Sequence, residues 1–127
     1  MKYIALDGQN VDRDVIMGEF SVGQAYGNVR LGHSFFVFKS RTKIYYISYA
    51  NLSYCFRRVM LLPAGILKSR TIPLNYIVLA DSTKELAQIE IQGESMAKQI
   101  LDEIKKAAPA VETNCPDFLK SAPTEEK

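Results

Sequence analysis

The chain contains 127 residues and carries a formal net charge of +2; 47% of its residues are hydrophobic and 24% are charged. These values predict one ordinary globular domain that buries a core without a disulfide framework or a structural metal. The small net charge and the lack of a readout motif argue against binding to nucleic acid. No segment approaches the ~20 apolar residues of a membrane span or resembles a signal peptide. We therefore expect no transmembrane segment and a cytoplasmic location.

The charged residues are unevenly distributed along the chain. Residues 29–70 contain eight basic residues and no acid, whereas the segments before and after them are slightly acidic. A stretch of 42 residues without an acid is the most unusual feature of the sequence. It predicts a basic surface, and a partner or surface that carries negative charge.

Residues 1–27 allow two interpretations. Val11–Phe20 predicts either a short helix, with Asn10 or Asp12 as its cap, or an early strand. Both stay open, so the structure of this N-terminal segment is uncertain from sequence.

From residue 28 onward the pattern is typical of β-strands, with aromatic and β-branched residues between polar or glycine-containing turns. In the last strand the apolar residues slip out of period two between Leu86 and Ile89, which indicates a β-bulge. The short connections favour antiparallel hairpins over a parallel sheet. We expect strands at residues 28–31, 34–38, 43–49, 52–62, 72–80 and 84–92, with loop residues at 63–65 and 68–70.

The clearest element is a helix over residues 94–108, which Pro109 ends. Its apolar residues fall on one stripe at helical spacing. The prolines and scattered charge of residues 110–127 predict a flexible tail. The domain therefore spans residues 1–109. The stripe consists of Ala97, Ile100, Leu101, Ile104 and Ala108.

Several consecutive strands followed by one amphipathic helix indicate an α+β, mainly β fold. Three segments carry a more specific resemblance: Arg30–Phe38, Lys43–Leu52 and Cys55–Val59. In order they contain a leucine-glycine turn with an aromatic strand, a tyrosine-tyrosine-isoleucine strand with a small polar bend, and an aromatic-arginine-arginine strand. They resemble small bacterial, Firmicutes-type pleckstrin-homology-like domain proteins of unassigned function, and the resemblance covers residues 29–109.

The resemblance implies a bent antiparallel barrel of about seven strands, with the C-terminal amphipathic helix capping one open end. It also implies a binding module, because this superfold hosts lipid binders, peptide binders and scaffolds. It offers no catalytic residues that could be transferred to this chain.

Lys39, Arg41 and Lys43 lie in and beside the connection between two predicted strands. Clustered Lys and Arg can donate charge-assisted hydrogen bonds to phosphate. Phosphoinositide-binding members of the superfold hold the headgroup with a basic hairpin of similar composition. The same composition is also typical of a solvated loop that resists aggregation. These three residues are candidates for binding an anion, a lipid or a protein partner.

Arg57 and Arg58 are adjacent in a predicted strand, so their side chains point to opposite faces. They are further candidates for contact with an anion or an acidic peptide. The alternative is a structural ion pair with an acid such as Glu90 or Glu94, because an inward-facing arginine requires a partner.

The sequence offers no set of side chains for catalysis. His33 is the sole histidine, and Cys55 and Cys115 form no short-spaced pair, so neither a triad nor a metal site can be assembled. A glycine-rich phosphate loop is also lacking. We expect two free thiols, with Cys55 in the core, and a protein that is not an enzyme and needs no cofactor or metal.

These observations favour a non-enzymatic module that recognises an acidic protein or peptide. The alternative is weak peripheral binding to anionic membrane lipid or phosphorylated headgroups through the basic hairpin, to which each basic residue contributes roughly 1 kcal/mol. An exposed strand edge also permits a homodimer.

Overall fold

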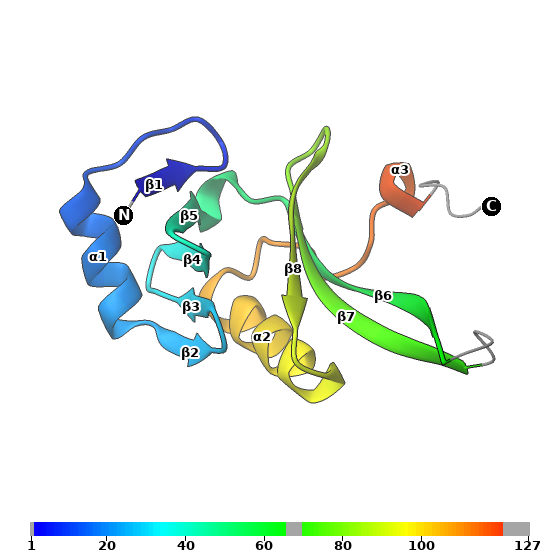
Figure 1. Ribbon diagram of the computed structural model, residues 1–127. Coiled ribbons are helices and arrows are strands. Elements are labelled where there is room, and N and C mark those ends of the chain that lie inside the picture. The colour runs from blue at the N-terminus through cyan, green and yellow to red at the C-terminus, as the bar shows by residue number, and fades with distance from the viewer. Residues whose placement is uncertain (1, 66–69, 121–127) are drawn as a thin grey trace.

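In the computed structural model, which describes residues 2–65 and 70–120, two β-sheets are packed with helices (Figure 1). The five-stranded sheet has the order β1-β5-β4-β3-β2 and the three-stranded sheet the order β6-β7-β8. The elements are β1 (Lys2–Ala5), α1 (Arg13–Val22), β2 (Gln24–Tyr26), β3 (Val29–Leu31), β4 (Phe35–Ser40), β5 (Lys43–Ser48), the 3-10 turn η1 (Tyr49–Asn51), β6 (Tyr54–Ala64), β7 (Arg70–Ala80), β8 (Glu85–Ile91), α2 (Glu94–Ala107) and α3 (Asp117–Lys120).

The α+β, mainly β class is confirmed, but neither sheet closes into a barrel within the described residues. Strands β2 to β5 form one antiparallel meander and β6 to β8 form a second. The short turns between these strands explain both meanders. The exception is β1, which pairs in parallel with β5 and adds an edge that the hairpin pattern did not predict.

The N-terminal segment contains a helix as well as two strands. The side chain of Asp12 caps α1 by accepting a hydrogen bond from the backbone N–H of Asp14, 2.9 Å away. Ile16 of α1 is fully buried against Val37 and Tyr46 on the outer face of the five-stranded sheet. The helical alternative for residues 11–20 is therefore the one that the structure adopts, over Arg13–Val22.

The larger core lies on the opposite face of the five-stranded sheet. There the buried side chains of both sheets meet the apolar stripe of α2, which lies beside both sheets in Figure 1. Ala97, Ile100 and Ile104 are fully buried, as the helical spacing predicts. The five-stranded sheet is thus covered on both faces, by α1 on one side and by α2 with the three-stranded sheet on the other.

The three-stranded sheet confirms one prediction and corrects another. The register shifts between Leu79 and Ala80, which face Ala87 and Glu85, so Leu86 is the extra residue of the predicted bulge. The loop predicted at residues 63–65 is wrong for Pro63 and Ala64, which lie in β6 and pair with β7. Proline is tolerated on an edge strand because a free edge needs no N–H donor. Residues 68 and 69 of the predicted loop lie outside the described residues, and residue 70 is in β7.

Residues 110–120, which the sequence assigned to a tail, contact the domain. Val111 is buried, and the carbonyl of Glu112 accepts a hydrogen bond from the N–H of Cys55 at 2.9 Å. The ring of Phe118 lies edge-on to Tyr54 with a centroid distance of 6.1 Å. The chain after α2 therefore runs along the start of β6.

Candidate functional site

The predicted basic hairpin is the turn between β4 and β5, here called the basic turn (residues 39–43). Ser40 pairs with Lys43, which leaves Arg41 and Thr42 as a two-residue loop. Arg41 has a φ of +58°, a conformation that favours glycine and costs an L-residue of order 1 kcal/mol or more. The turn therefore holds a long cationic side chain where the backbone alone would favour glycine.

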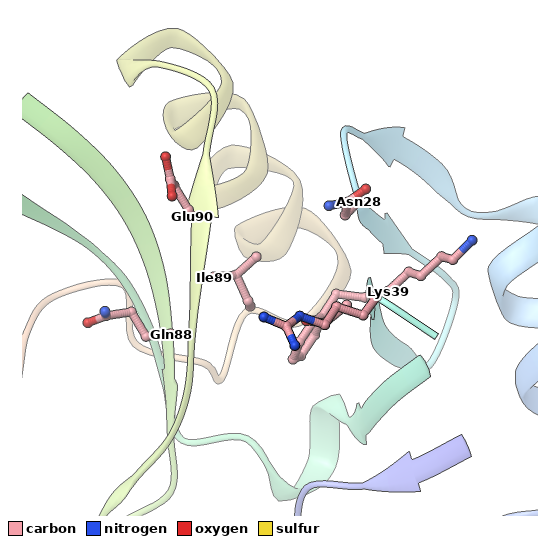
Figure 2. A pocket seen from close by; sticks show the side chains of 8 residues that line it. Asn28, Lys39, Gln88, Ile89 and Glu90 are labelled. Carbon is pink, nitrogen blue, oxygen red and sulfur yellow. The ribbon is translucent and has the colours of Figure 1, made fainter. Parts of the chain in front are cut away.

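Strand alternation divides the three predicted cations of the basic turn. Lys39 faces Ile44 in the register, on the side covered by α1, whereas Lys43 shares the opposite side with Tyr45. Figure 2 shows the Lys39 side chain running away from β8. Lys39 and Lys43, which the sequence analysis grouped with Arg41, therefore leave opposite faces of the sheet.

A fourth cation joins this end of the sheet. Lys2 is the register partner of Lys43 in the parallel pair of β1 and β5, so both side chains leave the same face. Sequence reasoning missed Lys2 because a lone lysine at the start of the chain gives no signal of parallel pairing with a distant strand. Within residues 2–65 and 70–120, no ion pair joins any of these four cations to an acid.

A cleft of about 230 Å³ lies between the basic turn and β8. Arg41 lines it on one side and Glu90 on the other, and the two apolar lining residues are Phe38 and Ile89. Figure 2 shows Gln88, Ile89 and Glu90 on β8, with Asn28 across the gap. The Glu90 side chain lies on the far side of β8 from this gap (Figure 2), so the cleft offers a cation and apolar contacts within one small space. Its full lining is Asn28, Phe38, Lys39, Ser40, Arg41, Gln88, Ile89 and Glu90.

Arg57 is engaged within the protein. Its Nε donates a hydrogen bond to Oδ1 of the buried Asn75 at 2.9 Å, and its Nη2 lies 3.6 Å from a carboxylate oxygen of Glu94. Lys98 and, secondarily, Arg57 lower the pKa of the Glu94 carboxyl. Glu94 is one of the two acids that the sequence offered as a structural partner.

Arg58 points to the other face and is also engaged. Its guanidinium lies 3.0 Å from Glu85 and donates a hydrogen bond to Gln88 at 2.7 Å, so its acidic partner is Glu85 and not Glu90. The same group lies over the ring of Phe56, 5.7 Å from its centroid. The two arginines are thus held by partners on β7, β8 and α2. Among the described residues, the cations of the basic turn form no ion pair of this kind.

The cysteines lie apart and are free thiols. Cys55 is fully buried, and this burial raises the pKa of its thiol to about 12, so it stays protonated and unreactive near neutral pH. Cys115 lines a second, more open hollow of about 730 Å³ with Tyr54 and Phe118. Over the described ranges, no three His, Cys, Asp or Glu side chains come together as a metal site.

Comparisons with protein-family models, curated proteins and solved structures find no match to this chain. In the part of the chain that the structure describes, no helix has the length and apolar character needed to cross a membrane.

Proposed function

We propose that this chain is a pleckstrin-homology-like scaffold with an N-terminal addition. The support is the order of its elements: a four-strand meander (β2 to β5), a three-strand meander (β6 to β8), and an amphipathic C-terminal helix that packs against both sheets. On this proposal β1 and α1 are additions that cover the outer face of the first sheet. Fold alone assigns no activity, so the function has to come from the site.

We further propose that the domain is a non-enzymatic module that binds an acidic segment of a protein partner at the cleft beside the basic turn. The observation that carries the proposal is the set of exposed cations at one end of the sheet that lack an acidic partner among the described residues. An incoming carboxylate would meet Arg41 without first displacing an internal ion pair. The strained backbone of Arg41 is consistent with a position retained for binding.

The lining of the cleft favours a peptide over a compact anion. The Lys39 side chain runs away from β8 (Figure 2), so a phosphate filling the space would meet one cation, Arg41. An extended segment can place an acidic side chain beside Arg41 and run its backbone along the edge strand β8. Apolar side chains of such a segment would cover Phe38 and Ile89.

Weak binding of anionic lipid through the basic turn stays a prediction. Lys39 and Lys43 leave opposite faces of the sheet, so a flat lipid surface meets only part of the cluster. The geometry therefore favours a peptide as the ligand of this site.

The proposal can be tested with a fluorescent glutamate-rich peptide and the full chain, using anisotropy at low and at physiological salt. We expect weak binding that decreases as salt rises, and a loss of about five-fold or more for Arg41→Glu because an attraction becomes a repulsion. Lys105→Glu reverses an exposed charge at the far end of α2 and is the matched control. Equal loss in both variants, or amide shifts in NMR spectra that avoid Asn28, Arg41 and Glu90, would contradict the assignment.

A further inference from the structure

The hairpin of β6 and β7 extends beyond the rest of the three-stranded sheet. The last pair between β7 and β8 is Asn75 with Ile91, whereas β6 and β7 stay paired as far as Ala64 and Arg70. The two-stranded part, residues 60–64 with 70–74, together with Val59 at its base, is here called the arm. Figure 1 shows β6 and β7 running away from α2 and the other sheet as a ribbon.

The arm exposes large apolar side chains on both of its faces. Val59 and Leu61 share one face, and Met60, Leu62 and Ile72 share the other, because successive strand residues alternate and Leu62 faces Ile72 in the register. Their exposed fractions run from 42% to 64%. Among the described residues only four other large apolar side chains are exposed, and they belong to α1 and α3: Val15, Met17, Val22 and Phe118.

The edges of the arm are protected, while its faces are not. Pro63 lies on β6 and Pro73 on β7, and neither can donate an N–H to an added strand. Strand-to-strand pairing with another chain is therefore disfavoured on both edges. What the arm offers to a partner is its side chains, above and below the ribbon.

The charge of the hairpin has one sign. Neither β6 nor β7 contains an acid, and Arg70 lies exposed at the start of β7. Arg57 and Arg58, at the base of the arm, are held by internal partners. Two copies of the arm packed with their ends together would bring the Arg70 side chains close with no acid from either hairpin between them, which disfavours a second copy as the occupant.

We propose that the arm inserts shallowly into the interface of an anionic phospholipid bilayer. A lipid interface surrounds a ribbon and can bury both apolar faces at once, whereas a flat protein surface covers one. Anionic headgroups complement Arg70. Six residues of strand span roughly 20 Å, less than the ~30 Å hydrocarbon core, so the arm lies in the interface and does not cross it.

This docking surface is separate from the proposed peptide cleft. The cleft is formed by the basic turn and β8 and includes no residue of the arm. The bilayer proposal therefore does not depend on the peptide proposal. Arm variants and Arg41 variants test the two surfaces independently.

The first experiment is co-sedimentation of the full chain with vesicles of phosphatidylcholine alone, and with vesicles containing an equal part of phosphatidylglycerol. We expect binding to the anionic vesicles that weakens with salt. Leu61→Gln on one face, and Met60→Gln with Leu62→Gln on the other, should each reduce partitioning by about ten-fold. Arg70→Gln should reduce it by about five-fold and flatten the salt dependence.

The matched control is Val22→Gln in α1, because Val22 is as exposed as Leu61 but lies outside the arm. This variant should bind the anionic vesicles like the parent chain. The proposal is overturned by equal binding of parent and arm variants, or by no binding of the parent to anionic vesicles. A dimer in light scattering that Leu61→Gln dissociates, without vesicle binding, assigns the arm to a second copy instead.

A second measurement keeps the test independent of losses in folding. The chain contains no tryptophan, so Leu61→Trp places a single apolar reporter on the arm and Val22→Trp places one on α1. Insertion predicts a blue shift of the Leu61→Trp emission, and quenching by brominated lipid, with anionic vesicles only. The same response from Val22→Trp, or none from Leu61→Trp, would refute insertion through the arm.

Discussion

Strands β4 and β6 each contain four large apolar residues in a row, and these two runs lie in opposite environments. Phe35–Phe38 of β4 lies between α1 and the main core, and its last three residues are buried. Val59–Leu62 of β6 lies in the arm, and all four residues are exposed. An uninterrupted apolar run is typical of a strand that is covered on both faces.

The difference shows what covering a strand requires. The strand β4 is in the middle of a five-stranded sheet, with a helix on one side and a helix with a second sheet on the other. Beyond Val59 the arm has no third strand within the described residues, and it runs away from α2 (Figure 1). A two-stranded ribbon is marginally stable by itself, so the apolar run in β6 is best explained by burial in something outside the domain.

The largest expected effect is the contrast between core and arm in stability. Ile104→Ala removes a fully buried side chain that joins α2 to both sheets, and it should cost about 2–5 kcal/mol of unfolding free energy. Leu61→Ala in the arm should change that free energy by less than about 0.5 kcal/mol. Urea unfolding followed by circular dichroism measures both, and similar losses would show that the arm is packed in solution.

The covered region should also lose stability at alkaline pH. Burial holds the pKa of the Cys55 thiol at about 12 when folded, against an ordinary value of 9.0. As the pH rises the unfolded chain therefore loses this proton first. Stability is full below pH 9 and falls by up to about 1.4 kcal/mol per pH unit until the folded thiol also ionises.

Burial also raises the pKa of Tyr49 well above its usual range, which adds to the fall at the upper end of this window. Cys55→Ala should make the decline between pH 9 and 11 less steep, whatever its effect on stability at pH 7. Urea midpoints measured across this range give the slope for both chains. An unchanged slope would show that ionisation of the Cys55 thiol does not contribute to the loss of stability at alkaline pH.

A smaller loss of stability is expected from a change at the base of the arm, where the buried part of the three-stranded sheet ends. Arg57→Ala removes the hydrogen bond to Oδ1 of the buried Asn75, and an unsatisfied buried acceptor costs about 1–3 kcal/mol. Hydrogen exchange should become faster in β6 and β7 beyond this point. Arg70→Ala, an exposed change further along the hairpin, is the control, and equal effects of the two would mean that Asn75 does not depend on Arg57.

The smallest expected change in stability is at the basic turn. Arg41→Gly relieves the positive φ and should leave stability unchanged or raise it by about 1 kcal/mol, while it weakens binding of the acidic peptide. Thermal unfolding and anisotropy together test this opposite response. A loss of both stability and binding would indicate that Arg41 serves the fold.

Much of the fold could be predicted because it follows from local patterns. The spacing of apolar residues predicted the stripe of α2 and a bulge between Leu86 and Ile89. The stripe is present, and the bulge lies at Leu86, at the start of that range. The parallel pairing of β1 with β5 was not predictable, because it joins residues far apart in the chain and leaves no local pattern. The continuation of β6 through Pro63 was missed because proline lacks the N–H that a central strand needs. It therefore predicts a loop unless the strand is known to lie at an edge.

For the candidate site, too, the residues close in sequence could be predicted and the contacts between distant strands could not. Sequence identified the basic turn and offered Glu94 as a partner for the arginine pair, and Arg57 does lie beside Glu94. It missed Lys2, and it could not place β8 across a cleft from Arg41. Each of these depends on which strands lie side by side.

The sequence by itself determined the class of the domain, its hairpins, its final helix and the basic character of residues 29–70, because composition and period act over a few neighbouring residues. Only the tertiary structure decided which apolar strands were covered and which cations kept an internal partner. Those outcomes depend on contacts between segments distant in the chain, and two equally apolar runs differ in what packs over them. That is why β4 became core and the arm became a surface.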